Sequence, residues 1–178
     1  MTTTYLDVET TFVVDENRRT DPSPFNANNK LVTVQYSHNN ELPQLHWFYH
    51  KDMDEMSTEM AVGEAFNLVQ NVLDKTTLLV GHNIKFDLMW LWESGFTYDG
   101  KLYDTMIGEY VLMRGQKWGL SLHDSCIRRK VALKKSDLTH NYLKDGIGFD
   151  AMPMDVVQEY GIADVESTKQ LYFAQQEI

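Results

Sequence analysis

The sequence predicts an α/β domain in which a mixed β-sheet, with the first strand at its centre, is covered by helices. Three observations lead to this fold class. β-branched and aromatic runs come early, a helical repeat followed by a short buried strand comes next, and mostly helical segments complete the chain. A length of 178 residues with 43% hydrophobic residues fits one domain, 1–178, with a substantial core.

The strands are predicted from short runs of apolar, β-branched and aromatic residues. These runs cover residues 4–8, 31–37, 45–50 and 77–80. The polar stretch 15–30, which contains Pro22 and Pro24, is expected to be a loop. Asn39-Asn40 separates the second run from the third, so these two runs are expected to form an antiparallel hairpin.

The helices are predicted from apolar residues at helical spacing and from capping residues. The expected helices cover residues 62–73, 83–93, 105–113 and 120–129, and Pro153 begins a long final helix. Asn83 and Asp104 are candidate N-caps, and Gly95 ends the first capped helix. Residues 134–150, which include Gly146 and Gly148, are expected to be irregular.

An acidic pair lies in the first predicted strand. Asp7 and Glu9 are two residues apart, so on a strand they project from one face while Leu6 and Val8 point into the opposite layer. Like charges this close repel each other unless a cation lies between them. An acidic pair in an apolar central strand is also costly without a function. Because 26 residues of the chain are acidic, such pairs arise by chance as well, and a solvated strand face is the alternative.

Two further motifs place polar groups on helix faces. Asn83, Phe86 and Asp87 are spaced i, i+3, i+4 where a buried strand enters a helix, so they share one face. That helix is nearly apolar all round, and a buried carboxylate in it requires a partner such as a metal. Tyr160 and Asp164, at i and i+4, are neighbours on the last helix, although an ordinary amphipathic helix is the alternative for this pair alone.

Taken together, the acidic positions predict a metal site. The candidate ligands are all carboxylates: Asp7, Glu9, Asp87 and Asp164. Four such groups would hold two divalent cations about 3.5–4 Å apart, one activating a water and the other stabilising the leaving 3′ oxygen of a phosphodiester. Ligands that are all oxygen favour Mg²⁺ or Mn²⁺ over Zn²⁺.

The segments LDVETT, HNIKFD and YGIAD, in this order, resemble the three motifs of the DEDD, or DnaQ-like, 3′–5′ exonuclease family. One branch of this family has a tyrosine four positions before the last aspartate, and the other has a histidine five positions before it. The chain has Tyr160 and Glu159 at these positions, so it resembles the tyrosine (DEDDy) branch, which includes the proofreading domains of family A DNA polymerases and the RNase D group. The resemblance runs from Asp7 to about Tyr172, and the insert before Leu31 is similar to that of phage family A polymerases.

This resemblance implies a ribonuclease-H-like fold with a central mixed sheet flanked by helices. The catalytic residues that it implies are Asp7, Glu9, Asp87, Tyr160 and Asp164. It further implies that Asp7, Glu9 and Asp164 surround one cation, that Asp7 and Asp87 surround the other, and that Tyr160 orients the attacking water with Glu9. The implied substrate-binding residues are Thr10 and Asn83 at the terminal nucleotide and Lys85 at a phosphate, although Lys85 has a solvated helix position as its alternative.

The charge of the chain is acidic, with a formal net charge of −10 and a pI near 4.9. This balance argues against a protein that holds nucleic acid mainly by a broad basic surface. Seven of the 16 basic residues nevertheless fall within positions 114–135: Arg114, Lys117, Arg128, Arg129, Lys130, Lys134 and Lys135. Two interpretations are open for this basic segment, a solvated face and an edge that follows phosphates.

The location expected for the chain is the cytoplasm, or the host cytoplasm if a phage encodes it. No stretch approaches the roughly 18 apolar residues of a membrane span, and the N-terminus lacks the pattern of a signal peptide. Cys126 is the only cysteine, so no internal disulfide is expected and a reducing compartment fits.

The expected function is 3′–5′ exonuclease activity, dependent on Mg²⁺ or Mn²⁺, that releases nucleoside 5′-monophosphates from single-stranded or frayed 3′ ends. DNA is favoured as the substrate, and the enzyme would be free-standing or the proofreading partner of a separate DNA polymerase. An RNase D-like 3′–5′ exoribonuclease is an alternative, because the motifs do not report the 2′-hydroxyl. A non-catalytic module that binds nucleic acid or a polymerase is a third possibility, and the presence of all five catalytic positions argues against it.

Overall fold

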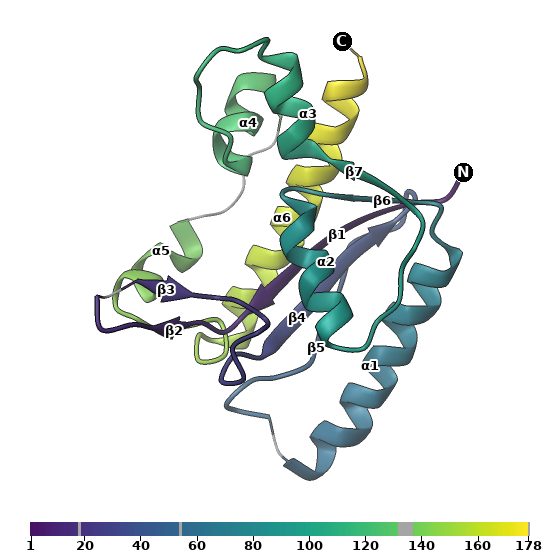
Figure 1. Ribbon diagram of the computed structural model, residues 1–178. Helices are drawn as coiled ribbons and strands as arrows, with labels where there is room; N and C mark the ends of the chain where they lie inside the picture. The colour runs from purple at the N-terminus through teal and green to yellow at the C-terminus, as the bar shows by residue number, and fades with distance from the viewer. Residues whose placement is uncertain (18, 54, 132–136, 178) are drawn as a thin grey trace.

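Five strands form a mixed sheet with helices on both faces in the computed structural model, which describes residues 1–17, 19–53, 55–131 and 137–177 (Figure 1). The strands, in the order in which they lie in the sheet, are β5 (Gln44–Trp47), β4 (Leu31–His38), β1 (Thr3–Thr10), β6 (Leu78–Gly81) and β7 (Lys101–Asp104). β1 pairs antiparallel with β4 and parallel with β6. The predicted α/β architecture with a central first strand is confirmed.

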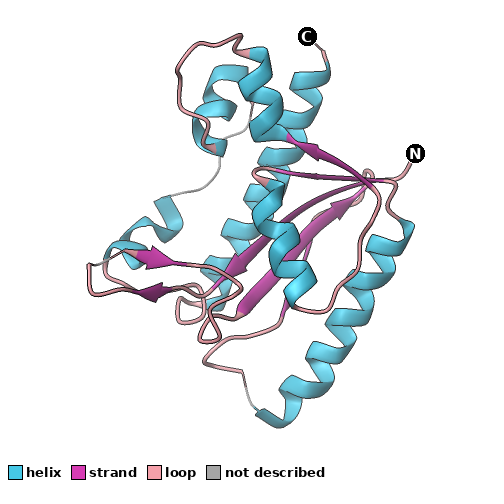
Figure 2. Cartoon of the chain, viewed as in Figure 1, coloured by secondary structure: helices cyan, strands magenta, loops and turns pink. Residues whose placement is uncertain are grey.

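Two long helices and a shorter one sandwich this sheet (Figure 2). α1 (Glu55–Lys75) and α2 (Ile84–Glu93) cover one face, where Leu6 and Val8 of β1 pack with Val69 and Leu88 in the main core. α6 (Met154–Gln176) covers the other face, where Val165 packs with Tyr5 and Val80. In the described parts of the chain, no helix is long and apolar enough to cross a membrane.

The remaining elements extend the sheet and its helical layer. α3 (Thr105–Leu112) and α4 (Leu122–Arg129) pack against α6, and α5 (Asp137–Lys144) also contacts it. β2 (Val13–Val14) and β3 (Thr20–Asp21) form a small separate hairpin.

The structure differs from the sequence predictions in two places and adds one element that they lacked. A short hairpin lies partly in the stretch expected to be a loop, strand β7 was not expected, and α5 lies in the region expected to be irregular. Each of these elements has eight residues or fewer, and tertiary contacts override weak local propensity in elements this short. The start of the region expected to be irregular, at Lys134, lies outside the described residues.

The two candidate N-caps differ in what their side chains do. The Asp104 carboxylate accepts a hydrogen bond from the Met106 amide at 2.8 Å and caps α3 as predicted. Asn83 occupies the N-cap position of α2 but has a left-handed backbone (φ 61°) and makes no side-chain capping bond. The backbone amide of Asn83 donates to the Asp104 carboxylate at 3.0 Å, so this one carboxylate accepts hydrogen bonds at the start of both helices.

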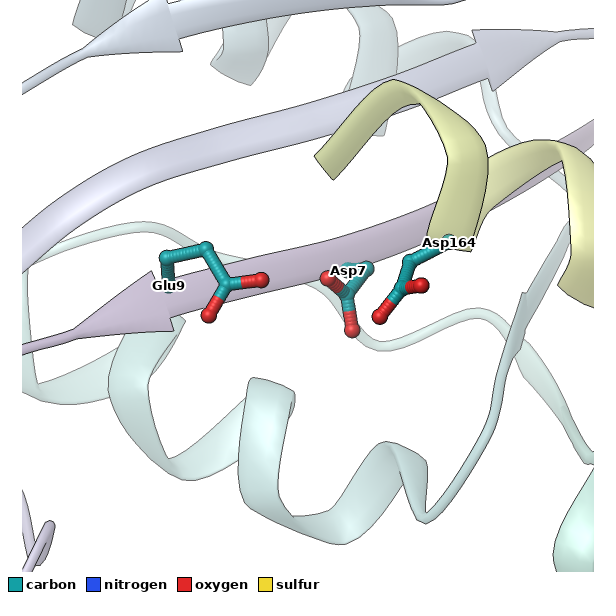
Figure 3. Close-up of side chains that lie close together, drawn as sticks. All are labelled: Asp7, Glu9 and Asp164. Atoms are coloured by element: carbon teal, nitrogen blue, oxygen red, sulfur yellow. The ribbon is translucent and has the colours of Figure 1, made fainter. Parts of the chain in front are cut away.

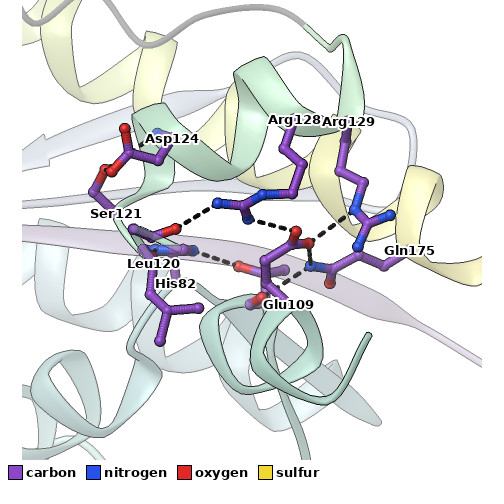
Figure 4. Close-up of polar contacts among 10 residues, drawn as sticks. His82, Glu109, Leu120, Ser121, Asp124, Arg128, Arg129 and Gln175 are labelled. Atoms are coloured by element: carbon purple, nitrogen blue, oxygen red, sulfur yellow. Dashed lines mark hydrogen bonds and ion pairs between the residues drawn. The ribbon is translucent and has the colours of Figure 1, made fainter. Parts of the chain in front are cut away.

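The basic segment contributes to a buried ion cluster (Figure 4). The fully buried Glu109 carboxylate accepts from Arg128 at 2.6 Å and from Arg129 at 2.9 Å, and the amide of Gln175 on α6 donates to it at 3.0 Å. The hydrogen bonds from the arginines and the amide outweigh desolvation by burial and lower the pKa of Glu109. Arg128 and Arg129 therefore tie α3 and α4 to α6, and neither interpretation of the basic segment holds for them. Lys134 and Lys135 lie outside the described residues.

Candidate active site

The acidic pair of β1 lies on the sheet face that α6 covers (Figure 3). Asp7 and Glu9 point toward this helix, whereas Leu6 and Val8 are buried in the core on the opposite face, as the strand alternation predicted. The register of β1 with β4 shifts between Glu9 and Thr10, so a bulge follows the acidic pair directly. Bulges re-aim side chains and are frequent beside active sites.

Asp164 of α6 completes a cluster of three carboxylates. One oxygen from each of Asp7, Glu9 and Asp164 lies within 4.8 Å of the others, and the side chains of Glu9 and Asp164 are buried. The close approach of α6 to the sheet depends on Gly161, because a Cβ there would meet the Gln35 side chain at 3.0 Å. The structure thus brings three predicted ligands together from two elements that are far apart in the sequence.

Asp87 reaches the same strand from the other face of the sheet. β6 pairs with β1 only from Thr3 to Tyr5, and beyond that point the Val8 amide donates to the Asp87 carboxylate at 3.0 Å. Burial raises the pKa of Asp87 well above its ordinary value, and the charge of Asp7 raises it further. Asp87 is outside the three-residue cluster, but it lies close enough to interact electrostatically with Asp7.

A buried amide on β4, which the sequence analysis missed, orients Asp7. The Gln35 amide donates to the Asp7 carboxylate at 2.7 Å, and its oxygen accepts from the Thr33 hydroxyl at 2.8 Å. Both side chains are fully buried. A signal was present in the sequence, because Thr33, Gln35 and Ser37 alternate with apolar residues in a strand that is buried on both faces.

Tyr160 is buried one helical turn before Asp164. Burial raises the pKa of its phenol, and the charges of Glu9, Asp164 and Asp7, together with a hydrogen bond to Asp164, raise it further. The phenol is therefore a neutral hydrogen-bonding group at any physiological pH. The Phe149 ring, 5.5 Å from the Tyr160 ring, packs against it.

The three candidate substrate-binding residues lie in different surroundings. Thr10 is buried and lines a cavity of about 360 Å³ together with Glu9 and Phe86. The sequence analysis named Phe86 only for its spacing on the helix. Its position directly before Asp87 was the signal that could have marked it as part of the site. Asn83 and Lys85 are exposed, and Lys85 lines a separate apolar cavity of about 750 Å³ between α2 and α3. None of the four candidate carboxylates lines this apolar cavity between α2 and α3.

The donor set of the cluster fits a hard divalent cation. Its three ligand atoms are all carboxylate oxygens, and their mutual distances allow one ion to contact all three. Burial makes such close negative charges costly without a cation, and this cost argues for a metal site over a solvated strand face.

The chain belongs to the 3′–5′ exonuclease family, because the family model of that description matches residues 21–176. The matched part contains Asp87, Tyr160 and Asp164. Asp7 and Glu9 precede it, so their association with Asp164 is a finding of the structure. No curated protein sequence matches the chain.

Solved structures with the same fold include a nuclease and a polymerase. A structure described as the apo form of a nuclease is 17% identical with a TM-score of 0.63, and the alignment covers 99% of this chain and 71% of that one. Brucella melitensis NrnC with bound Mg²⁺ is 19% identical with a TM-score of 0.62, covering 98% and 72%. The family B DNA polymerase of the archaeon Pyrobaculum calidifontis is 14% identical with a TM-score of 0.62, covering 97% of this chain and 24% of the polymerase. At these identities the likenesses concern the fold, which is the expected ribonuclease-H-like one.

Proposed function

We propose that this chain, acting as a single domain, is a metal-dependent exonuclease that removes nucleoside 5′-monophosphates from the 3′ ends of DNA. The observation that carries the proposal is the convergence of the Asp7, Glu9 and Asp164 carboxylates on a buried face, with Tyr160 beside them. Membership of the 3′–5′ exonuclease family supports the direction of cleavage.

The proposed cofactors are two divalent cations, Mg²⁺ or Mn²⁺. Asp7, Glu9 and Asp164 would hold one of them, and Asp7 with Asp87 the other. When bound, such cations supply an activated water and neutralise charge on the phosphate. The all-oxygen donor set supports this choice, as does the Mg²⁺ bound by the structurally similar Brucella melitensis NrnC.

The protein groups around the carboxylates have distinct proposed roles. The protonated Tyr160 phenol would orient the attacking water together with Glu9, since its raised pKa keeps the hydroxyl available as a donor. The cavity beside Glu9 would take the terminal nucleotide, with Thr10 as a polar contact and Phe86 as an aromatic wall. Gln35 would hold the Asp7 carboxylate in one orientation.

DNA is the proposed substrate, with single-stranded or frayed 3′ ends favoured because the terminal nucleotide enters a small cavity. The similarity in fold to one quarter of a DNA polymerase supports this choice and a role in proofreading. The enzyme would work alone or beside a separately encoded polymerase. The proposed location is the cytoplasm, which the single, buried Cys126 supports.

The deciding experiment follows single-nucleotide release from a 5′-labelled single-stranded DNA in Mg²⁺ or Mn²⁺. We expect a ladder shortened from the 3′ end for the wild type and loss of activity by at least about a hundredfold for Asp7→Asn and Asp164→Asn. Asp155→Asn, an exposed position on the same helix, is the matched control for contaminating nucleases and for charge.

Three results would overturn parts of the proposal. Equal activity of the wild type and both site variants would show that the assigned carboxylates do not catalyse the reaction. Faster cleavage of an RNA of the same sequence would make the chain an exoribonuclease. Binding of DNA without any cleavage in either metal would make it a non-catalytic module.

A further inference from the structure

A second, polar cavity adjoins the one that the terminal nucleotide is proposed to enter. It has a volume of about 230 Å³ and shares Phe12 as a wall with the cavity beside Glu9. The chain runs directly from one to the other, because Glu9 and Thr10 line the first and Thr11 lines the second. A ligand seated at the carboxylates therefore has this polar cavity as an immediate neighbour.

Two lysines bring positive charge to this polar cavity in an otherwise acidic protein. Lys30 and Lys51 both line it, and the one acidic residue among the described residues of its wall is Asp150. The Lys51 ammonium lies 3.3 Å from the Asp150 carboxylate and the Lys51 side chain is 59% exposed. The Lys30 ammonium lies 4.0 Å above the Tyr49 ring, a contact that holds the cation without cancelling its charge.

The backbone around these lysines is held to the elements that carry the active site. The Thr11 amide donates to the Lys30 carbonyl at 2.9 Å, and the Lys30 amide donates to the Thr11 hydroxyl at 2.7 Å. Lys30 is thereby tied to the segment that directly follows β1. The Lys51 amide donates to the Asp150 carbonyl at 2.9 Å, just before the start of α6. Both lysines are thus positioned relative to the strand and the helix that provide the carboxylates.

We infer that Lys30 and Lys51 form a subsite for the phosphodiester backbone of the substrate strand, upstream of the terminal nucleotide. This inference rests on the proposed function. It places the phosphate contacts on the cavity beside Phe12 and away from Arg128 and Arg129, whose charges are used in the ion cluster with Glu109. An ammonium group binds a phosphate as a point charge and reads no base, so the subsite is independent of sequence.

The test compares substrates that do and do not reach the subsite. Oligothymidylate of eight nucleotides has upstream phosphates, whereas the dinucleoside monophosphate TpT has only the scissile one. For the double variant Lys30→Gln/Lys51→Gln we expect KM for the eight-nucleotide strand to rise about tenfold at unchanged kcat, with both constants for TpT unchanged. The slope of log KM against log salt should fall by up to about 1.4, or about 0.7 for each lost phosphate contact.

The matched control removes the same charge elsewhere. Lys75→Gln/Lys101→Gln changes two exposed lysines, one at the end of α1 and one on β7, and should leave KM for both substrates unchanged. The variant Lys30→Arg/Lys51→Arg keeps both charges and should retain most of the affinity of the wild type. Fluorescence anisotropy with labelled eight-nucleotide DNA in EDTA gives the same comparison without catalysis.

Two results would overturn the subsite. One is an equal rise in KM for the eight-nucleotide strand in Lys30→Gln/Lys51→Gln and in Lys75→Gln/Lys101→Gln. The other is a rise in KM for TpT, in Lys30→Gln/Lys51→Gln, as large as the rise for the eight-nucleotide strand. Absence of cleavage by the wild type would count against the proposed function, whereas wild-type cleavage with no selective loss in Lys30→Gln/Lys51→Gln would count against the subsite alone.

Discussion

Gly161→Ala should impair catalysis while leaving the stability of the protein nearly unchanged. Alanine is favoured over glycine inside a helix by about 0.5–1 kcal/mol, so α6 itself gains stability. The new Cβ would lie 3.0 Å from Cδ and 3.1 Å from Nε2 of Gln35, closer than the ordinary contact distance of about 3.4–4 Å. The amide must therefore retreat by a few tenths of an ångström, and its 2.7 Å hydrogen bond to Asp7 is the contact that changes.

The size of the effect follows from this displacement. If a misplacement of about 1 Å costs about a hundredfold, a shift of about 0.4 Å costs about sixfold in kcat. The free energy of unfolding in urea should stay within about 1 kcal/mol of the wild type, because the helix gain offsets the crowding. A second readout is the rise in melting temperature on adding Mn²⁺, which should be smaller in the variant if Asp7 is misaligned.

Gly63→Ala is the matched control, since this glycine lies on α1, where the Cβ of alanine would have no neighbouring atom within 4 Å and would add only helix propensity. Gln35→Leu removes the donor altogether and should lower kcat further. Wild-type kcat and an undiminished Mn²⁺ effect in Gly161→Ala would refute the view that the Gln35 amide sets the geometry of Asp7.

Three other changes give separate tests. Glu109→Gln leaves two arginine side chains, only 16% and 18% exposed, without their anion, and should lower the free energy of unfolding by about 3 kcal/mol in urea at pH 7. Because folding lowers the pKa of Glu109, the stabilisation by its carboxylate is complete above the ordinary pKa of 4.5 and is lost as the pH falls through the lower pKa of the folded protein. The difference in unfolding free energy between Glu109→Gln and the wild type should therefore shrink in acid. A difference that stays constant with pH would contradict this. Tyr160→Phe should lower kcat about tenfold to a hundredfold. Because burial raises the pKa of this phenol above its ordinary value of 10.0, the wild type should lose no activity through its ionisation up to pH 10.0. A pH–activity profile that falls below that pH in the wild type, but not in Tyr160→Phe, would argue against the proposed role of Tyr160. EDTA should abolish cleavage and Mn²⁺ should restore it, and cleavage that persists after dialysis against EDTA would exclude the carboxylates as a metal site.

Much of the architecture was predictable because its signals are local. The runs of apolar, β-branched and aromatic residues at 4–8, 31–37 and 77–80 depend on neighbours in the chain, and all three became strands of the sheet. The acid pair of β1 was readable for the same reason, since two residues on a strand always share a face. α5 was missed because its eight residues, DLTHNYLK, have little helix propensity of their own.

The partners of the site residues were beyond the reach of sequence spacing. Gln35 meets Asp7 only because β4 pairs with β1, and no local pattern in the sequence indicates this contact. The same pairing buries the hydrogen bond from Thr33 to Gln35. Arg128 and Arg129 illustrate the same limit, because a basic segment is read as surface until the packing of α3 against α4 buries Glu109 between them.

By itself the sequence identified the candidate residues of the site, since acidic pairs and i, i+4 neighbours are set by the repeat of a strand or a helix. Only the tertiary structure decided how they meet. Asp164 joins Asp7 and Glu9 because Gly161 lets α6 lie close to the sheet, and Asp87 reaches β1 because β6 stops pairing at Tyr5 and leaves the Val8 amide to it. The physical reason is that hydrogen bonds and charges act over a few ångströms in space, whatever the separation along the chain.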